Sequence, residues 1–408
     1  MAARRRVAVT GMGVRTPAGA HPKELWNALL SGRSTARRIT SFDTEGLGVG
    51  FACEVPDLDE ETYLTPKEVR RLDRAARLAV CAAGDALADA GAVRTPAARR
   101  AVVTGSSFGG MRTTEATLFD GRHPGRGNPG PLYMPQIMHN APAAAISIRF
   151  QAAGPSLSVA TACASGADAI GAGARLIRDG SADLVIAGGT EACVTATVLM
   201  AFDRCGALSR RNDAPERAGR PFDVERDGFV LAEGAAFAIL ESLEHALRRD
   251  ARVHAELAGY GACSDAYHLT APSAQGEGAY RCMRAALSDA GLAADEIAHV
   301  SAHGTGTRLN DLGEAQAIGR LFGSVRVPVT AAKGVTGHAI GATGAIEAVA
   351  AVLAMGELTI PPIANLETPD PKCDINVVRK VRSMPPGPVM SNSFGFGGHN
   401  ASLIFAPI

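Results

Sequence analysis

The cysteine at position 163 stands in a local setting that favours nucleophilic chemistry. It lies in SVATACASGAD, after the strand-like run GPSLSVAT and before the small-residue helical run ASGADAIGAGARLIRDG. At such a strand-to-helix turn, the free N–H groups of the helix point toward the side chain. Because a helix N-terminus favours negative charge, the sequence predicts a lowered pKa for Cys163 and a reactive thiolate. Taken alone, Cys163 could equally be a structural cysteine that is buried as a small hydrophobic residue.

Two histidines occupy glycine-rich turns of a similar kind. His303 lies in VSAHGTGTRLND, and His338 lies in VTAAKGVTGHAIGATG together with Lys333. Turns after parallel strands gather at one edge of a sheet, so both imidazoles can converge on Cys163. A thiolate would then attack a thioester, while the imidazoles hydrogen-bond a second carbonyl as charge builds on its oxygen. Taken singly, either histidine is more often a core residue.

The C-terminal stretch VMSNSFGFGGHNASLIFAPI predicts a strand, a glycine-rich loop and a returning strand. Glycines leave backbone N–H groups unobstructed, which is what an oxyanion hole requires. A plain β-hairpin with a wide turn is the alternative.

The elements that must position these residues alternate along the chain. Strand-like runs such as RAVVTGSS and ADLVIAGG are separated by alanine-rich helical runs such as RLDRAARLAVCAAGDALADAG. This alternation predicts an α/β fold with helices on mostly parallel strands. The sequence contains a weak internal repeat, in which a reactive residue precedes a Gly- and Ala-rich helix. This repeat predicts a duplicated architecture. We expect halves at 1–255 and 256–408 with the two small-residue helices at the centre.

Composition narrows the classes of protein. Lys+Arg and Asp+Glu both number 41, and this zero net charge argues against a nucleic-acid surface or an anionic-membrane binder. The eight cysteines form no CxxC pair, which predicts reduced thiols in a cytoplasmic protein with neither a zinc site nor a disulfide framework. TGMGVRTPAG lacks the third glycine of a dinucleotide fingerprint, so we interpret it as a turn after a first strand. No uncharged apolar run reaches the ~18 to 20 residues that span a bilayer.

Four motifs together carry a family resemblance. TACASG, AHGTGT, KGVTGHAIGATGAIEA and NSFGFGG occur in the order and at the separations of the β-ketoacyl-acyl-carrier-protein synthase I/II type condensing enzymes, in the thiolase superfamily. The sequence resembles this family over essentially its whole length. The resemblance implies a duplicated thiolase-like fold, layered α-β-α-β-α, with two mostly parallel sheets around central small-residue helices.

The resemblance also implies roles for particular residues. Cys163 looks like the acyl-accepting nucleophile, His303 and His338 like the paired histidines, and Lys333 like the active-site lysine. Glu347, nine residues after His338, looks like the carboxylate neighbour of that lysine.

Further positions match the family's binding residues. Phe396 resembles the gating phenylalanine, whose backbone N–H shares the oxyanion hole with that of Cys163. Thr305 and Thr307 match the threonines that hold the phosphopantetheine arm, and Phe108 stands where the family often has a smaller residue lining the acyl pocket. The run TPKEVRRLDRAARLA matches a basic helix that docks the carrier protein, and three of its residues form what we call the basic triplet: Lys67, Arg70 and Arg71.

The implied reaction is a decarboxylative condensation. An acyl group passes from a carrier protein to Cys163, malonyl-carrier protein loses carbon dioxide, and the resulting carbanion attacks the acyl-cysteine. No metal, nucleotide or organic cofactor is implied, because phosphopantetheine arrives on the carrier protein. The implied partners are an acyl carrier protein and either a second copy or a ketosynthase-like chain-length factor, with no nucleic acid and no membrane.

Other classes of protein match these motifs less well. A thiolase would present a second cysteine near its C-terminus, a chain-initiating enzyme would have asparagine at position 338, and a non-catalytic chain-length factor typically lacks the nucleophile. A cysteine hydrolase lacks an evident orienting residue. Within the condensing enzymes, the arginine-rich composition and Phe108 favour a type II polyketide pathway, and housekeeping fatty-acid elongation is the alternative.

Overall fold

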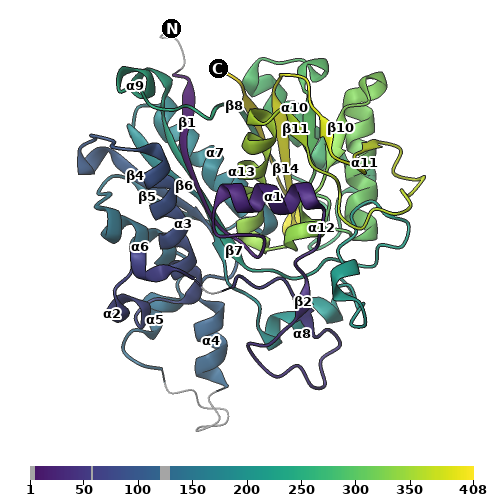
Figure 1. Ribbon diagram of the computed structural model, residues 1–408, viewed down its shortest axis with the longest axis horizontal. Coiled ribbons are helices and arrows are strands. Elements are labelled where there is room, and N and C mark those ends of the chain that lie inside the picture. The colour runs from purple at the N-terminus through teal and green to yellow at the C-terminus, as the bar shows by residue number, and fades with distance from the viewer. Residues whose placement is uncertain (1–4, 57, 120–128) are drawn as a thin grey trace.

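An extended β-sheet runs through the whole molecule (Figure 1). The computed structural model describes residues 5–56, 58–119 and 129–408. Within them the strand order is β12-β10-β9-β14-β15-β8-β1-β7-β6-β4-β5. The strands of this sheet are β1 (Val7–Arg15), β4 (Arg100–Gly105), β5 (Ser156–Val159), β6 (Leu184–Glu191), β7 (Gly234–Ser242), β8 (Ala255–Ser264), β9 (His299–Ser301), β10 (Pro328–Thr330), β12 (Asn376–Val377), β14 (Val389–Gly395) and β15 (His399–Ala406).

The sheet consists of two halves that meet where β1 pairs with β8. Ala8 lies opposite Glu256, and Val9 lies opposite Ala255, so the two predicted sheets form one hydrogen-bonded ladder. The α/β prediction is confirmed, but the strands are not mostly parallel. Parallel pairing occurs only within β5-β4-β6 and β14-β9-β10-β12. Parallel neighbours need a long crossover, whereas three residues join β14 to β15 and force them antiparallel.

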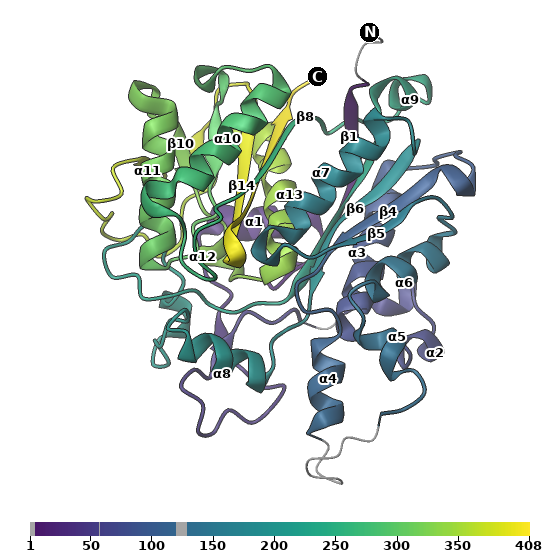
Figure 2. The ribbon, with the colours of Figure 1, turned by 180° about the vertical axis from the view of Figure 1, so that it is seen from behind.

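The helices form three layers around the two halves of the sheet (Figures 1 and 2). α3 and α6 cover the outer face of the N-terminal half, α10 and α11 cover the C-terminal half, and α7 and α13 lie between them. This is the α-β-α-β-α order that the sequence predicts. The helix bounds are α1 (Pro22–Ser31), α2 (Pro66–Val69), α3 (Arg74–Ala90), α4 (Met111–Leu118), α5 (Tyr133–Ile137), α6 (Ala141–Phe150), α7 (Ser165–Arg178), α8 (Ala196–Arg204), α9 (Leu243–Arg248), α10 (Glu277–Ala290), α11 (Arg308–Phe322), α12 (Lys333–Thr336) and α13 (Thr343–Gly356).

Short elements complete the fold outside the main sheet. Two small antiparallel pairs form, β2 with β3 and β11 with β13. Their bounds are β2 (Arg37–Arg38), β3 (Phe51–Ala52), β11 (Thr359–Ile360) and β13 (Arg382–Ser383).

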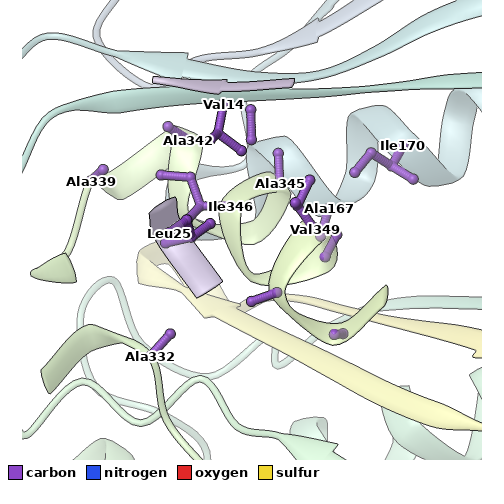
Figure 3. Packing of buried hydrophobic residues seen from close by; sticks show 14 of the residues in the cluster. Val14, Leu25, Ala167, Ile170, Ala332, Ala339, Ala342, Ala345, Ile346 and Val349 are labelled. Atoms are coloured by element: carbon purple, nitrogen blue, oxygen red, sulfur yellow. The ribbon is translucent and has the colours of Figure 1, made fainter. Parts of the chain in front are cut away.

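The central helices α7 and α13 pack against each other through small side chains. Figure 3 shows Ala167 of α7 together with Ala345 and Val349 of α13, and all three side chains are buried. Ile346 of the same helix is also buried beside Leu25 of α1. Alanine lets the two helix backbones approach closely, while each buried valine or isoleucine contributes about 1.5–3 kcal/mol. The predicted pair of central small-residue helices is confirmed.

Two further features bear on the class of protein. All eight cysteines are free thiols, so no disulfide bond links two parts of the fold. Across the described ranges, every helix is too short or too polar to cross a membrane. The division of the chain at residue 255, where β8 begins, stays a prediction.

Candidate active site between the two halves of the sheet

Cys163 lies in a tight turn at the start of a central helix. The 3-10 turn η3 (Ala162–Ala164) precedes α7, as the sequence predicts. Ala162 adopts a left-handed backbone conformation with φ of 49°, which is unusual for a residue other than glycine. The hydroxyl of Ser165 donates to the carbonyl of Ala162 over 2.7 Å and accepts the N–H of Thr161 over 2.9 Å. These bonds hold the turn that carries Cys163.

The Cys163 side chain faces a cavity of about 830 Å³. Cys163 is only 8% exposed, so water reaches little of this residue. Seven of the residues singled out in the sequence line the cavity: Phe108, Cys163, His303, Thr305, Thr307, His338 and Phe396. Lys333 and Glu347 are buried outside the cavity lining, and the basic triplet lies elsewhere on the surface.

The two imidazoles converge on the sulfur. Nε2 of His338 lies 3.2 Å from Sγ of Cys163, and the rings of His303 and His338 are 5.4 Å apart in an edge-to-face arrangement. His338 is fixed on both sides of its backbone, since its N–H donates to Val230 and its carbonyl accepts from Ala232. The structure therefore brings together the three residues that the turn positions predict to meet.

A buried lysine stands behind His303. Nζ of Lys333 lies 3.1 Å from Nδ1 of His303, also donates to the carbonyl of His303, and lies 2.8 Å from Oε1 of Glu347. The side chains of Lys333 and Glu347 are 1% and 0% exposed, so this is a buried ion pair. Burial raises the pKa of Glu347 to about 7, while Lys333 opposes that shift. The three acceptors around Nζ fix the lysine and, through it, the ring of His303.

The pKa of Cys163 is shifted in the direction opposite to the one that the sequence predicts. The helix N-terminus predicts a lowered pKa for Cys163, but burial raises the pKa of this thiol from 9.0 to about 11. Lys333 and the N–H groups of Phe396 and Cys163 act in the opposite direction without outweighing burial. Desolvation wins because the thiolate would lose nearly all of its water. The resting group is therefore a thiol.

Both histidines are neutral at ordinary pH. Burial lowers the pKa of His303 and of His338 well below 6.5, and the charge of Lys333 lowers both further. Lys333 donates to Nδ1 of His303, which leaves the ring proton of His303 on Nε2. Nδ1 of His338 lies 3.0 Å from the hydroxyl of Thr343, which fixes the orientation of that ring. Neutral imidazoles of this kind can donate a hydrogen bond to a carbonyl oxygen.

The same contacts bear on metal binding. Cys163, His303 and His338 place one possible ligand atom each within 4.8 Å of one another, the one such group found in the described part of the chain. A metal would need the lone pair of Nε2 of His303, yet the Lys333 contact leaves a proton on that nitrogen. The arrangement suits a hydrogen-bond donor better than a metal ligand.

The glycine-rich loop approaches the nucleophile closely. Phe396 opens the 3-10 turn η9 (Phe396–Gly398), and its N–H interacts with the sulfur of Cys163. A Cβ at Gly395 would lie only 2.9 Å from the nitrogen of Cys163, so a larger residue there would push the loop away. Two backbone donors, those of Cys163 and Phe396, thus lie at one point beside Sγ. This is the arrangement that an oxyanion hole requires.

Aromatic rings form one wall of the cavity. The ring of Phe108 packs edge-to-face on Phe202 at 6.2 Å, and Phe202 also contacts Phe229 at 5.3 Å and Phe396 at 6.2 Å. Phe229 in turn packs on the ring of His338. On another part of the lining, the hydroxyls of Thr305 and Thr307 lie 2.9 Å apart. Phe108 therefore belongs to a continuous aromatic group that touches the reacting residues.

Sequence reasoning missed several residues of the site. Glu314, buried in α11, accepts the N–H groups of His303 and Gly304 over 2.8 and 2.9 Å and so fixes the turn that carries His303. Phe202 and Phe229 carry no motif that separates them from ordinary core aromatics. Glu314 follows His303 by eleven residues on a helix, and this spacing alone predicts no contact.

The basic triplet is exposed but does not share one helix. α2 ends at Val69, so Arg70 and Arg71 fall in the turn before α3. The helix cannot run through because Asp73 is extended, with ψ of 156°, to cap α3. All three basic side chains face solvent, and no ion pair occupies them among the residues that the structure describes. Their predicted role in docking is thus sterically open.

Comparison with known proteins places this site in a family. Residues 4–246 match the profile described as Beta-ketoacyl synthase, N-terminal domain, and residues 254–367 match Beta-ketoacyl synthase, C-terminal domain. A protein of Coxiella burnetii (strain RSA 493 / Nine Mile phase I) named 3-oxoacyl-[acyl-carrier-protein] synthase 2 is 42% identical, over 99% of both chains.

Solved structures agree with the sequence comparison. The ishigamide ketosynthase/chain length factor is 38% identical with a TM-score of 0.92, covering 100% of both chains. AntDE:AntF, described as a type II PKS acyl-carrier protein in complex with its ketosynthase bound to the hexaketide, is 31% identical with a TM-score of 0.90, covering 99% of this chain and 100% of that chain. The predicted thiolase-like fold is confirmed. The chain belongs to the β-ketoacyl synthase family and is an acyltransferase of the ketosynthase type.

Proposed function

We propose that this ketosynthase joins an acyl group held on Cys163 to a malonyl unit on an acyl carrier protein, with loss of carbon dioxide. The product is a β-ketoacyl-carrier protein. The contact that carries this proposal is the 3.2 Å approach of His338 Nε2 to Cys163 Sγ, with His303 beside it and backed by Lys333. A nucleophile, two neutral donors and two backbone N–H groups are the parts that such a condensation needs.

The first half-reaction transfers the acyl group to the enzyme. Sγ of Cys163 attacks the thioester carbonyl of the acyl-carrier protein, the bond to the carrier's sulfur breaks, and the thiol proton passes to the departing arm. Because the resting group is a thiol, Nε2 of His338 accepts this proton while Nδ1 carries the ring proton, and then passes it to the departing sulfur. In the other neutral tautomer, Nδ1 accepts from the hydroxyl of Thr343 and Nε2 becomes a donor for the second half-reaction. The N–H groups of Cys163 and Phe396 stabilise the oxyanion, and each such donor is worth about 3 kcal/mol.

The second half-reaction forms the new carbon–carbon bond. His303 and His338 donate hydrogen bonds to the thioester oxygen of the malonyl group, so that negative charge can build there when the carboxylate leaves as carbon dioxide. The resulting carbanion attacks the acyl carbonyl, and the Cys163 sulfur leaves as a thiolate and takes up a proton from solvent water. Because the pKa values of His303 and His338 are lowered, both rings stay neutral. Neutral imidazoles donate hydrogen bonds without protonating the carbanion.

For the pathway, we propose fatty-acid elongation of the synthase 2 type. The name of the Coxiella relative supports this alternative better than the type II polyketide pathway that composition and Phe108 favour. The polyketide pathway remains the second candidate, because one similar solved structure is described as a type II PKS acyl-carrier protein in complex with its ketosynthase and because Phe108 lines the cavity. The two pathways differ in the acyl chain that Cys163 accepts.

The proposed partner is an acyl carrier protein. The complex of a type II PKS acyl-carrier protein with its ketosynthase supports this, as does the exposed basic triplet, which suits an acidic partner. The assembly is a homodimer or a heterodimer with a chain-length factor. We propose that no metal, nucleotide or organic cofactor takes part, since loss of carbon dioxide supplies the driving force, and that the enzyme is cytoplasmic.

The test is an acylation assay followed by mass spectrometry. The purified protein is incubated with acyl-carrier proteins of C2 to C16 and polyenoyl chains, and the intact mass is measured. Cys163→Ala is the inactive variant, and Cys81→Ala is the matched control, because Cys81 is also a buried cysteine but lies in the outer helix α3. A one-acyl shift in wild type and Cys81→Ala, absent in Cys163→Ala, is expected. A shift that persists in Cys163→Ala, or none with any donor, would contradict the proposal.

The same assay separates the two pathways. Addition of malonyl-carrier protein to the acylated enzyme should remove the acyl mass and yield a β-ketoacyl-carrier protein. Preference for saturated chains would support fatty-acid elongation, whereas preference for polyenoyl or polyketonic chains would support the specialised pathway.

A further inference from the structure

Glu191 is a fully buried carboxylate that the proposed mechanism does not use. It ends β6, and four hydrogen-bond donors surround its two oxygens. Oε1 accepts the hydroxyl of Ser106 over 3.1 Å and the N–H of Phe108 over 3.2 Å. Oε2 accepts the N–H of Ser107 over 2.7 Å and the N–H of Gly341 over 3.2 Å. Each neighbour donates, so the site requires an acceptor on both arms.

The direction of the hydroxyl bond is fixed by its other partner. Ser106 Oγ accepts the N–H of Gly109 over 3.1 Å, which leaves its own proton for Glu191. An amide at position 191 would instead turn an NH2 group toward donors on one of the two arms. The four bonds therefore distinguish a carboxylate from its closest neutral relative.

The donors come from two segments that are far apart in the sequence. Ser106, Ser107 and Phe108 follow β4, and the ring of Phe108 forms part of the cavity wall. Gly341 lies in the 3-10 turn η8 (Ile340–Ala342), three residues after His338. One side chain thus joins the wall of the cavity to the turn that carries an imidazole.

A third connection reaches the nucleophile. The hydroxyl of Ser107 donates to the carbonyl of Ala162 over 2.9 Å, directly before Cys163. Ala162 and Ile340 both adopt left-handed backbone conformations, with φ of 49° and 41°. Non-glycine residues hold such conformations only where their surroundings enforce them. Glu191 accepts the N–H of Gly341, which follows Ile340, and the N–H of Ser107, whose hydroxyl binds Ala162.

The contact is too close to tolerate rearrangement. A Cβ at Gly341 would lie 2.6 Å from Oε2 of Glu191 and 2.7 Å from the nitrogen of Ser107. The two segments therefore meet at a distance that only glycine at 341 permits. Glu191 itself is absent from the cavity lining, so it acts through the segments it binds.

We propose that Glu191 is a positioning residue for the ketosynthase reaction, which sets the placement of His338 relative to Cys163 and holds the cavity wall at Phe108. This inference rests on the proposed function. Loss of the carboxylate should release the N–H groups of Ser107 and Gly341 and let both segments move. Acyl transfer to Cys163 and the choice of acyl chain should then change together.

The test is Glu191→Gln in single-turnover acylation. We expect the rate of Cys163 acylation to fall about 10- to 100-fold, the loss that accompanies a displacement of roughly 1 Å at a reacting pair. Binding of the carrier protein, measured by fluorescence anisotropy, should change less than about 2-fold because Glu191 lies away from the surface. The ratio of acylation rates for long and short chains should also shift, which a purely structural role would not produce.

Glu241→Gln provides the matched control. Glu241 is equally buried and pairs with Leu184 at one end of the β6–β7 ladder, whereas Glu191 pairs with Gly234 at the other end. Its partners Thr10, His245 and Arg249 lie outside the cavity lining. The variant should lose stability but acylate within about 2-fold of wild type with an unchanged chain preference.

The experiment distinguishes failure of the Glu191 inference from failure of the proposed function. A folded Glu191→Gln variant with wild-type acylation rates and chain preference would overturn the inference. If Glu191→Gln does not fold, Ser107→Ala decides, since it removes the bond to Ala162 and leaves the carboxylate in place. Ser107→Ala should acylate several-fold more slowly, and a wild-type rate would again overturn the inference. Absence of acylation in the wild-type protein would instead count against the proposed function.

Discussion

The thiol of Cys163 should ionise at an unusually high pH in the free enzyme. Cys163 lines the cavity with an exposed fraction of 8%, and burial raises the pKa of its thiol from 9.0 to about 11. The charge of Lys333 is the largest opposing influence. The perturbation that tests this balance is therefore pH, applied to wild type and to Lys333→Met.

The fraction of Cys163 present as thiolate follows from its pKa shift. A change from 9.0 to about 11 lowers the thiolate fraction at pH 8 about 100-fold, to roughly one molecule in a thousand. Removal of the Lys333 cation takes away a stabiliser of the thiolate, so the pKa should rise further. At any pH between 7 and 10, Lys333→Met should then react more slowly than wild type.

The assay is alkylation by iodoacetamide, which needs the thiolate. Initial rates are measured between pH 7 and 10, and the peptide that contains Cys163 is quantified by mass spectrometry. Peptide mapping separates Cys163 from the other seven cysteines, and Cys163→Ala verifies the assignment. The rate should rise about tenfold for each pH unit over the whole range, without a plateau.

A plateau below pH 8 would refute this reasoning. It would mean that the helix N-terminus and the backbone donors outweigh the loss of water around the sulfur, as the sequence alone predicts. Faster alkylation in Lys333→Met at constant pH would equally contradict the assigned role of the lysine charge. Circular dichroism at each pH verifies that the compared proteins are folded.

Three further predictions concern stability, chain choice and docking. Glu347→Gln leaves Lys333 buried without its counter-charge, which should cost about 3–5 kcal/mol; for 408 residues this lowers Tm by roughly 4–6 °C, and an unchanged melting curve would contradict it. Phe108→Ala removes the ring that packs on Phe202 and should raise kcat/KM for longer acyl chains relative to shorter ones; a constant ratio in a competition assay would show that this wall does not limit the chain. Charge reversal of the basic triplet to glutamate should raise KM for the carrier protein with little change in kcat, and more so at low salt, whereas equal KM values would place docking elsewhere.

Much of the site is predictable because its signals are local. A short strand followed by small residues at helical spacing specifies a turn, and the types at Cys163, His303 and His338 specify the chemistry. Because such turns gather at one edge of a sheet, the sequence also predicts that these side chains meet, and the structure places them within hydrogen-bonding or ring contact. The small-residue composition of α7 and α13 likewise predicts close packing at the centre, since it depends on side-chain size alone.

Other features depend on partners that are remote in the chain. The joining of the two halves of the sheet depends on the pairing of β1 with β8, in which Ala8 lies opposite Glu256. The contacts of Glu314 and Glu191 with backbone N–H groups join segments whose spacing in the sequence carries no periodic signal.

The sequence by itself thus determined the family, the nucleophile, the two histidines and the layered architecture, because each is written in short-range residue types and spacings. Only the tertiary structure decided the ionisation of Cys163, since desolvation is the sum of everything packed around the sulfur. The tertiary structure also decided that Lys333 contacts both His303 and Glu347. Three segments must fold together before one ammonium group can touch them all.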